Sequence, residues 1–241
     1  MNSTLLKIAA LLSIWIVFLC AIPVQAQFQR QFGTNLDETF SKVIQSGANY
    51  YALGSGEITD GQPPRATVTR LNAAGELQWT LSLNTGSQWN DAVLTPNGDL
   101  LVVGHSLPDD NTSRGIMGRV SALGTFVWVR AYDLPNRDGF DHIVRNPVPQ
   151  TAAYPYYVLG HQIQALPGID DVFLINIDES GDINWKKIYI SDADDEFASD
   201  FEALPNGDLI LAGQREGQGL IFRAHNTGLI FNGVTPEMPF T

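Results

Sequence analysis

Gly75-Glu-Leu-Gln-Trp79, Gly124-Thr-Phe-Val-Trp128 and Gly181-Asp-Ile-Asn-Trp185 are three copies of one pattern, and they decide the fold. A weaker fourth copy, Gly228-Leu-Ile-Phe231, is one residue shorter. The three tryptophans are 49 and 57 residues apart. A pattern that recurs at this period indicates repeated structural units rather than one irregular domain.

A second pattern, an apolar strand that ends in glycine, repeats in the same phase. Its four copies end at Gly54, Gly104, Gly160 and Gly213, which are 50, 56 and 53 residues apart. Two independent markers in one phase predict four units. These units lie at about residues 34–83, 84–132, 133–189 and 190–232.

Each unit reads as four antiparallel strands. Pro96-Asn-Gly-Asp99 and Pro205-Asn-Gly-Asp208 contain Asn-Gly, the preferred tight hairpin turn, and join a short first strand to the strand that ends in glycine. The third unit has a longer join, from Asn146 to Pro155. The remaining expected strands are first strands at 39–44, 91–94, 140–144 and 198–203, third strands at 66–71, 115–120, 172–177 and 219–223, and fourth strands at 77–83, 126–132 and 183–189.

The predicted fold is therefore all-β and β-propeller-like, with four four-stranded antiparallel blades. A single blade cannot bury both of its faces, so each blade stacks against its neighbours. Trp79, Trp128 and Trp185 are expected to fill the gaps between blades rather than to form a ligand-binding stripe.

These units resemble the blades of secreted bacterial β-propeller repeat proteins. In that family an acidic pair precedes the strand that ends in glycine, and here Asp37-Glu38 precede Gly54 at a spacing of 17 residues. The corresponding residues of the four units are Asp37, Ser87, Asp138 and Glu196. The resemblance covers essentially the whole mature chain. It implies a fold but no single activity, because propellers serve as lectins, hydrolases, lyases, adhesins and scaffolds.

The resemblance also bears on completeness, because propellers of this group usually have more than four blades. An open or incomplete propeller is slightly favoured over a closed four-bladed ring, and a fragment of a longer propeller protein is an alternative. Phe28-Gln-Arg-Gln-Phe32-Gly33 is similar to the fourth strand of a unit, so the chain is expected to begin with an outermost strand.

The first 26 residues have the pattern of an export signal. Lys7 precedes an apolar run from Ile8 to Cys20, and Val24-Gln-Ala26 is a small-x-small cleavage pattern. The run is shorter than the roughly 20 apolar residues of a membrane helix. The sequence therefore predicts a secreted or cell-surface protein without stable membrane insertion after cleavage, and an uncleaved anchor is the alternative.

The net negative charge limits which molecules can be binding partners. Cleavage would remove Lys7 and leave 13 basic against 26 acidic residues, a net charge of 13 − 26 = −13. Nucleic acid is excluded as a partner because phosphate binding needs clustered Lys and Arg. An acidic protein of this kind is soluble, and its expected partner is an unidentified glycan or protein.

Two histidines at equivalent positions are possible metal ligands. His105 and His161 both follow the strand-ending glycine, so they occupy equivalent positions in neighbouring units. A metal ion shared by the two imidazoles is one interpretation, and two polar residues that each leave a strand are the preferred one. No nucleophile elbow, Walker loop or His-Glu-x-x-His motif occurs.

Carboxylates are enriched in the loops of one predicted face. These acids are Asp37, Glu38, Glu57, Asp60, Asp109, Asp110, Asp133, Asp138, Asp170, Asp171, Asp192, Asp194, Asp195, Glu196 and Glu216. Ca²⁺ bound by Asp192, Asp194, Asp195 and Glu196 is a weak candidate. Solvated turn residues are the preferred interpretation, since Asp is favoured in turns.

The sequence favours a secreted or cell-surface, non-catalytic binding or scaffold module whose ligand is unknown. Variable loops such as Gly56–Pro64 and Gln162–Gly168 are the expected binding elements. A polysaccharide-active hydrolase or lyase is the alternative, because two carboxylates at a defined separation could serve a glycosidase. No catalytic residue and no cofactor is assigned.

Overall fold

The computed structural model describes residues 28–33, 36–57, 59–106, 113–132, 137–148, 153–163, 170–189, 196–215 and 217–229. The expected signal segment, residues 1–26, lies outside them. Among the described residues there is no helix of the length and apolarity that would cross a membrane.

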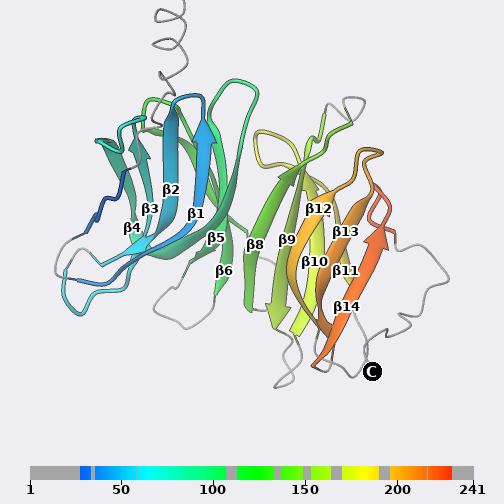
Figure 1. The fold of residues 1–241 in the computed structure, drawn as a ribbon. Helices are drawn as coiled ribbons and strands as arrows, with labels where there is room; N and C mark the ends of the chain where they lie inside the picture. Colours follow the sequence, from blue (N-terminus) through cyan, green and yellow to red (C-terminus); the bar gives the residue numbers. More distant parts are fainter. Residues whose placement is uncertain are drawn as a thin grey trace, which may run out of the picture. The chain divides into compact units, whose positions relative to one another are not determined.

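Antiparallel strands in chain order account for the described fold (Figure 1). The strands are β1 (Glu38–Ser46), β2 (Asn49–Gly56), β3 (Arg65–Leu71), β4 (Leu77–Leu94), β5 (Leu100–Ser106), β6 (Arg114–Val120), β7 (Phe126–Tyr132), β8 (Arg137–Arg145), β9 (Tyr156–Ile163), β10 (Asp170–Ile177), β11 (Ile183–Tyr189), β12 (Glu196–Ala203), β13 (Leu209–Arg215) and β14 (Gln218–Ala224). One sheet runs from β1 to β7, a second contains β8 to β11, and a third contains β12 to β14.

Four blades can be defined from this pairing. Blade 1 contains β1, β2, β3 and the first half of β4, and blade 2 contains the second half of β4 with β5, β6 and β7. Blade 3 is β8 to β11, and blade 4 is β12 to β14. The prediction of an all-β, propeller-like fold with antiparallel blades is confirmed. A fourth strand for blade 4 would begin after Leu229 and lies outside the described residues.

Two expectations at the N-terminal end differ from the structure. The strands expected at 77–83 and 91–94 are one continuous strand, because pairing with β3 extends to Gly86 and pairing with β5 begins at Ser87. The outermost strand expected at Phe28–Gly33 is wrong, since these residues form no strand. Gly33 has a φ of 145°, and with Phe32 it lies against the face of blade 1 instead of pairing at a sheet edge.

The strand-ending glycine has a steric cause. Each first strand contains a β-bulge, and the residue before the bulge pairs with the glycine, as Trp89 pairs with Gly104. A methyl group on Gly104 would collide with the carbonyl oxygen of Gln88. The bulged residues of the four blades are Ser41, Asn90, Asp141 and Ser199. A glycine opposite each bulge therefore allows a close backbone approach.

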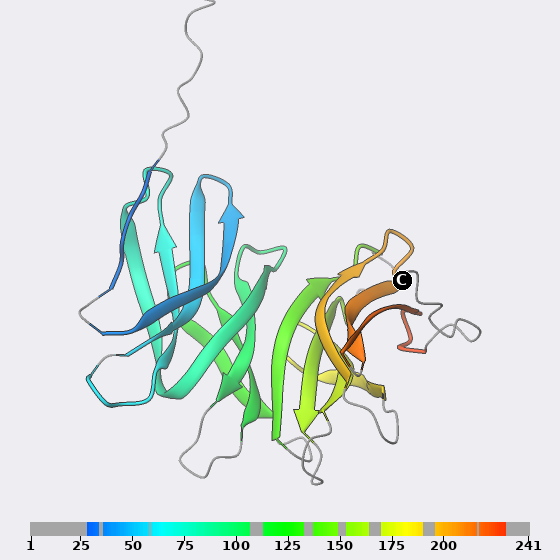
Figure 2. The ribbon, with the colours of Figure 1, turned by 60° about the horizontal axis from the view of Figure 1, so that its bottom comes forward.

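The blades pack face to face through three apolar clusters. In both views the strands of blade 3 lie beside those of blade 2 and of blade 4 (Figures 1 and 2). We call the face turned to the next blade the leading face and the opposite one the trailing face. Tyr51 and Leu53 on the leading face of blade 1, for example, meet Leu100 and Val102 on the trailing face of blade 2.

Each repeat tryptophan is half-buried and packs on the glycine turn of the next blade. Trp79 touches the turn of blade 2, where a Cβ on Gly124 would lie 2.7 Å from the indole. Gly181 stands in the same relation to Trp128. The glycine and the tryptophan of the repeat are thus two sides of one contact between neighbouring blades.

The strand register corrects one residue in the alignment of the four units, which was based on the distance to the strand-ending glycine. The family pattern aligned Asp37 with Ser87, but Glu38 pairs with Gly56 as Ser87 pairs with Ser106. The difference of one residue arises because the β1–β2 hairpin is shorter than the β4–β5 hairpin. Glu38 is therefore the structural equivalent of Ser87.

The leading face of blade 4 is uncovered. Ile210 and Ile221 are 39% and 64% exposed, whereas Leu101 and Met117 at the same positions of blade 2 are 2% and 1% exposed. Among the described residues, no fifth blade covers this face.

Replacing the bulge-facing glycine should destabilise the protein. In Gly213→Ala the new methyl group meets the backbone of Phe197, so we expect a loss of about 1–3 kcal/mol in the free energy of unfolding. The control is Gly219→Ala in the neighbouring strand, where no atom lies within 4 Å of the added carbon, and this change should be neutral or slightly stabilising. Urea denaturation measures both, and equal stability of the two variants would contradict the steric account.

Candidate functional site

Asp91 is the centre of a polar cluster on the innermost strands. Its Oδ1 lies 2.8 Å from Lys42 Nζ, and its Oδ2 lies 3.6 Å from His142 Nδ1. The backbone N–H groups of Ala92 and Ile143 also donate to this buried carboxylate. Burial alone would raise the pKa of Asp91, but the neighbouring side chains of His142 and Lys42 outweigh it and lower the pKa. Asp91 is therefore a fully engaged structural anion that links three blades.

A second carboxylate, Asp138, makes the same kind of link at the loop end. Its Oδ1 accepts the backbone N–H of Gly115 in blade 2 at 3.1 Å. In the blade before, Ser87 Oγ accepts the N–H of Ala66 at 3.1 Å. Ala66 and Gly115 are equivalent positions, so the residue at this place of the family pattern connects blade 2 to blade 1 and blade 3 to blade 2.

The bulged residues add further links between blades. Ser41 Oγ donates to the carbonyl oxygen of Trp89 at 2.7 Å, and Asn90 Nδ2 donates to that of Phe140 at 2.8 Å. Both acceptors occupy the same position in the next blade. Ser41 and Asn90, like Asp91 and Asp138, therefore connect neighbouring blades.

The two histidines predicted at equivalent positions do lie close to each other. A Cβ on Gly139 would be 2.9 Å from His161 Cε1 and 3.6 Å from His105 Cβ. His161 Nδ1 is 2.7 Å from Asp141 Oδ2, and His105 Nδ1 is 3.4 Å from Asn90 Nδ2. Burial lowers the pKa of His105. Within the described part of the chain, no group of three or more His, Cys, Asp or Glu side chains is arranged to hold a metal ion.

The calcium candidates stay a prediction. Asp192, Asp194 and Asp195 lie outside the described residues, and the side chain of Glu196, at the start of β12, does so too. Of the other loop acids, Asp171 is buried and accepts a hydrogen bond from Gln162 Nε2 at 3.1 Å.

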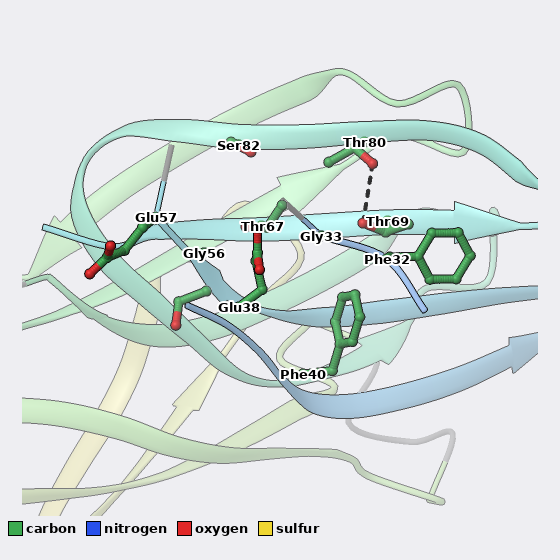
Figure 3. Close-up of a pocket in the computed structure, with 11 residues that line it drawn as sticks. Phe32, Gly33, Glu38, Phe40, Gly56, Glu57, Thr67, Thr69, Thr80 and Ser82 are labelled. Atoms are coloured by element: carbon green, nitrogen blue, oxygen red, sulfur yellow. Dashed lines mark hydrogen bonds between the residues drawn. The ribbon is translucent and has the colours of Figure 1, made fainter. Parts of the chain in front are cut away.

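The candidate binding site is a pocket of about 230 Å³ on the trailing face of blade 1 (Figure 3). Figure 3 shows the rings of Phe32 and Phe40 at one end and the carboxylate of Glu57 at the other. Between them lie hydroxyl groups from β3 and β4. The polar lining residues are Glu38, Ser55, Glu57, Thr67, Thr69, Thr80 and Ser82.

The pocket exists because blade 1 departs from the repeat. Thr67 and Thr69 stand on its trailing face where blade 3 has Phe173 and Ile175. Thr69 Oγ1 lies 3.2 Å from Thr80 Oγ1, and either can donate. A blade with a neighbour on this side would bury apolar side chains here, so the hydroxyl groups fit a face that contacts water or a polar ligand.

Sequence reasoning missed this pocket. The alternation Ala66, Thr67, Val68, Thr69 contains the signal, because its apolar members face blade 2 and its hydroxyl members face away. The signal becomes visible only when the strand is aligned with its apolar equivalents in the other blades.

Comparison with solved structures gives distant matches. A protein of unknown function from Bacteroides caccae is 12% identical with a TM-score of 0.40, and the match covers 84% of this chain and 83% of that one. A GH43 endo-arabinanase from Bacillus licheniformis is 12% identical with a TM-score of 0.41, and the match covers 78% and 74%. No protein-family model and no curated protein matches the chain. The assignment of a propeller-like fold rests on the strand pairing in the structure itself.

The buried Asp138 should make stability depend on pH. Burial raises its pKa from 3.8 to about 6, and its Oδ2 has no hydrogen-bond partner among the described residues. Because the folded state keeps the proton longer than the unfolded state, stability falls as pH rises from about 4 to 6. This fall in the free energy of unfolding is on the order of 2–3 kcal/mol, and it should be absent in Asp138→Asn, which has no titrating group at this position.

Chemical denaturation at several pH values between 3 and 8 tests this expectation. Asp60→Asn, at an exposed turn residue, is the matched control and should follow the wild-type curve. A wild-type curve that does not differ from that of Asp138→Asn would contradict the assignment.

Proposed function

We propose that this protein is an exported, non-catalytic binding module that takes a glycan unit in the pocket of blade 1. The observation that carries the proposal is the replacement of apolar side chains by hydroxyl groups on one blade face, next to the half-buried ring of Phe32 and the exposed ring of Phe40. Export rests on the predicted signal at residues 1–26.

The chemistry of the pocket suits a sugar. Threonine and serine hydroxyl groups both donate and accept hydrogen bonds, and the carboxylates of Glu38 and Glu57 accept them. The rings of Phe32 and Phe40 offer flat apolar surfaces for the C–H face of a pyranose. The volume of about 230 Å³ is below the roughly 300–1,000 Å³ of typical small-molecule sites, and so fits a single sugar ring better than a long chain.

The non-catalytic character is supported by the fate of the buried acids. Both oxygens of Asp91 are engaged by backbone N–H groups and by Lys42, and its pKa is lowered, so it stays ionised and does not have the freedom of a general acid. Glu38 and Glu57 are the carboxylates that line the pocket, and a glycosidase would need both.

Phe40→Ala should weaken glycan binding about tenfold, because the 44% exposed ring is lost while the strand pairing stays. Calorimetric titration with cellohexaose, xylohexaose, mannohexaose and maltohexaose measures the effect. Leu123→Ala, at an 85% exposed turn residue of blade 2, is the control and should bind as the wild type does. Absence of binding to all four sugars, or equal binding by Phe40→Ala, would refute the proposed site.

The hydrolase alternative has its own test. The same oligosaccharides are incubated with the protein, and new reducing ends are measured. Release of sugar that disappears in both Glu38→Gln and Glu57→Gln would show an enzyme and contradict a non-catalytic module. No release is the expected result.

A further inference from the structure

A second pocket lies between blades 3 and 4, on residues that the first site does not use. It has a volume of about 340 Å³. Aromatic rings from blade 3 and side-chain amides from both blades line it, and no charged side chain is among the described lining residues. The residues that matter are Tyr154, Tyr157, Asn176, Asn184, Trp185 and Asn226.

The pocket exists because an arginine of the repeat is absent. Arg70 of blade 1 donates through Nη1 to the carbonyl oxygen of Ala122 in blade 2 at 2.9 Å. Arg119, its equivalent in blade 2, reaches Glu179 of blade 3 at 3.1 Å. The same position in blade 3 is Asn176, whose side chain is too short to cross to blade 4.

The partner of the arginine has changed as well. Glu179 is the second residue of the glycine turn of blade 3, and Asn226 takes this place in blade 4. An ion pair that fills the junction between blades 2 and 3 is thus replaced by two amides between blades 3 and 4. Each of these two replacements puts a smaller, uncharged side chain at the junction between blades 3 and 4.

A third departure adds an aromatic wall. The hairpin between β8 and β9 is longer than its equivalents and is closed by the bond from Asn146 N to Pro155 O at 2.8 Å. Tyr154 comes from this hairpin and lines the pocket. The insertion and the two substitutions all distinguish this blade junction from the others and converge on one cavity.

The polar groups of the pocket are fixed before any ligand arrives. Asn176 Nδ2 donates to the carbonyl oxygens of Tyr154 and Tyr156, both at 2.9 Å, and its Oδ1 accepts from Asn184 Nδ2 at 3.0 Å. Tyr157 OH donates to the carbonyl oxygen of Asn226 at 3.3 Å. Preformed amides of this kind cost little ordering when a ligand binds.

We infer that this pocket is a second saccharide site, specific for a neutral sugar ring. The amides of Asn184 and Asn226 can donate to and accept from sugar hydroxyl groups, and Trp185 and Tyr154 supply aromatic surface. A charged ligand would lose water without gaining an opposite charge, so uronic acids and cationic ligands are disfavoured. The inference deepens the proposed binding function but does not depend on the pocket of blade 1.

The decisive variant is Asn176→Arg, which restores the residue that fills the other junctions. Titration with the methyl glycosides of neutral hexoses, followed by tryptophan fluorescence, should show a spectral change in the wild type. We expect at least a tenfold loss of affinity in Asn176→Arg, and methyl glucuronide should bind the wild type at least tenfold more weakly than methyl glucoside. Asn184→Ala is the second variant, because its exposed side chain can be lost without unfolding the strand, and it should also bind more weakly.

Leu123→Ala, at an exposed turn residue of blade 2, is the control, and it should keep the wild-type fluorescence response. Trp185→Phe should lose that response. Wild-type binding by both Asn176→Arg and Asn184→Ala, or no response to any neutral glycoside, would overturn the inference. If either outcome is found but Phe40→Ala still weakens oligosaccharide binding, the proposed function stands and only the second site is refuted.

Discussion

The structure depends on one close approach inside each blade, where a carbonyl oxygen of the first strand passes over the α-carbon of a glycine. A side chain on Gly54, Gly104, Gly160 or Gly213 would push the two strands apart. The bulge that this contact permits turns the next side chains toward the neighbouring blade, as Asn90 and Asp91 show. Packing between blades is therefore set up by a backbone contact within each blade.

Sequence predicted the strands well because two markers report on two packing contacts. The glycine follows from the bulge, and the glycine–tryptophan spacing follows from the indole of one blade lying on the turn of the next. The path of Phe32 and Gly33 could not be predicted, since strand-like composition does not say whether a segment joins a sheet edge or lies on its face. The continuity of β4 was missed because apolar patterning marks buried faces and not where a strand bends.

Candidate sites were harder to predict than the fold, for a physical reason. Acids and histidines are the usual candidates for functional residues, yet Asp91 and Oδ1 of Asp138 accept hydrogen bonds that link neighbouring blades. Thr67 and Asn176 are unremarkable as residue types. They become informative only when the strand register shows that Thr67 takes the position of Phe173 and Asn176 the position of Arg119. The signal is therefore a departure from the repeat rather than a motif.

The unbroken strand β4 limits how the molecule can open. Blades 1 and 2 share its 18 residues, with hydrogen bonds to β3 along one half and to β5 along the other. The two blades are joined here by continuous backbone rather than by a loop, so fraying that starts in one blade reaches the other through the same strand. The pair should therefore behave as one cooperative unit in native-state amide exchange.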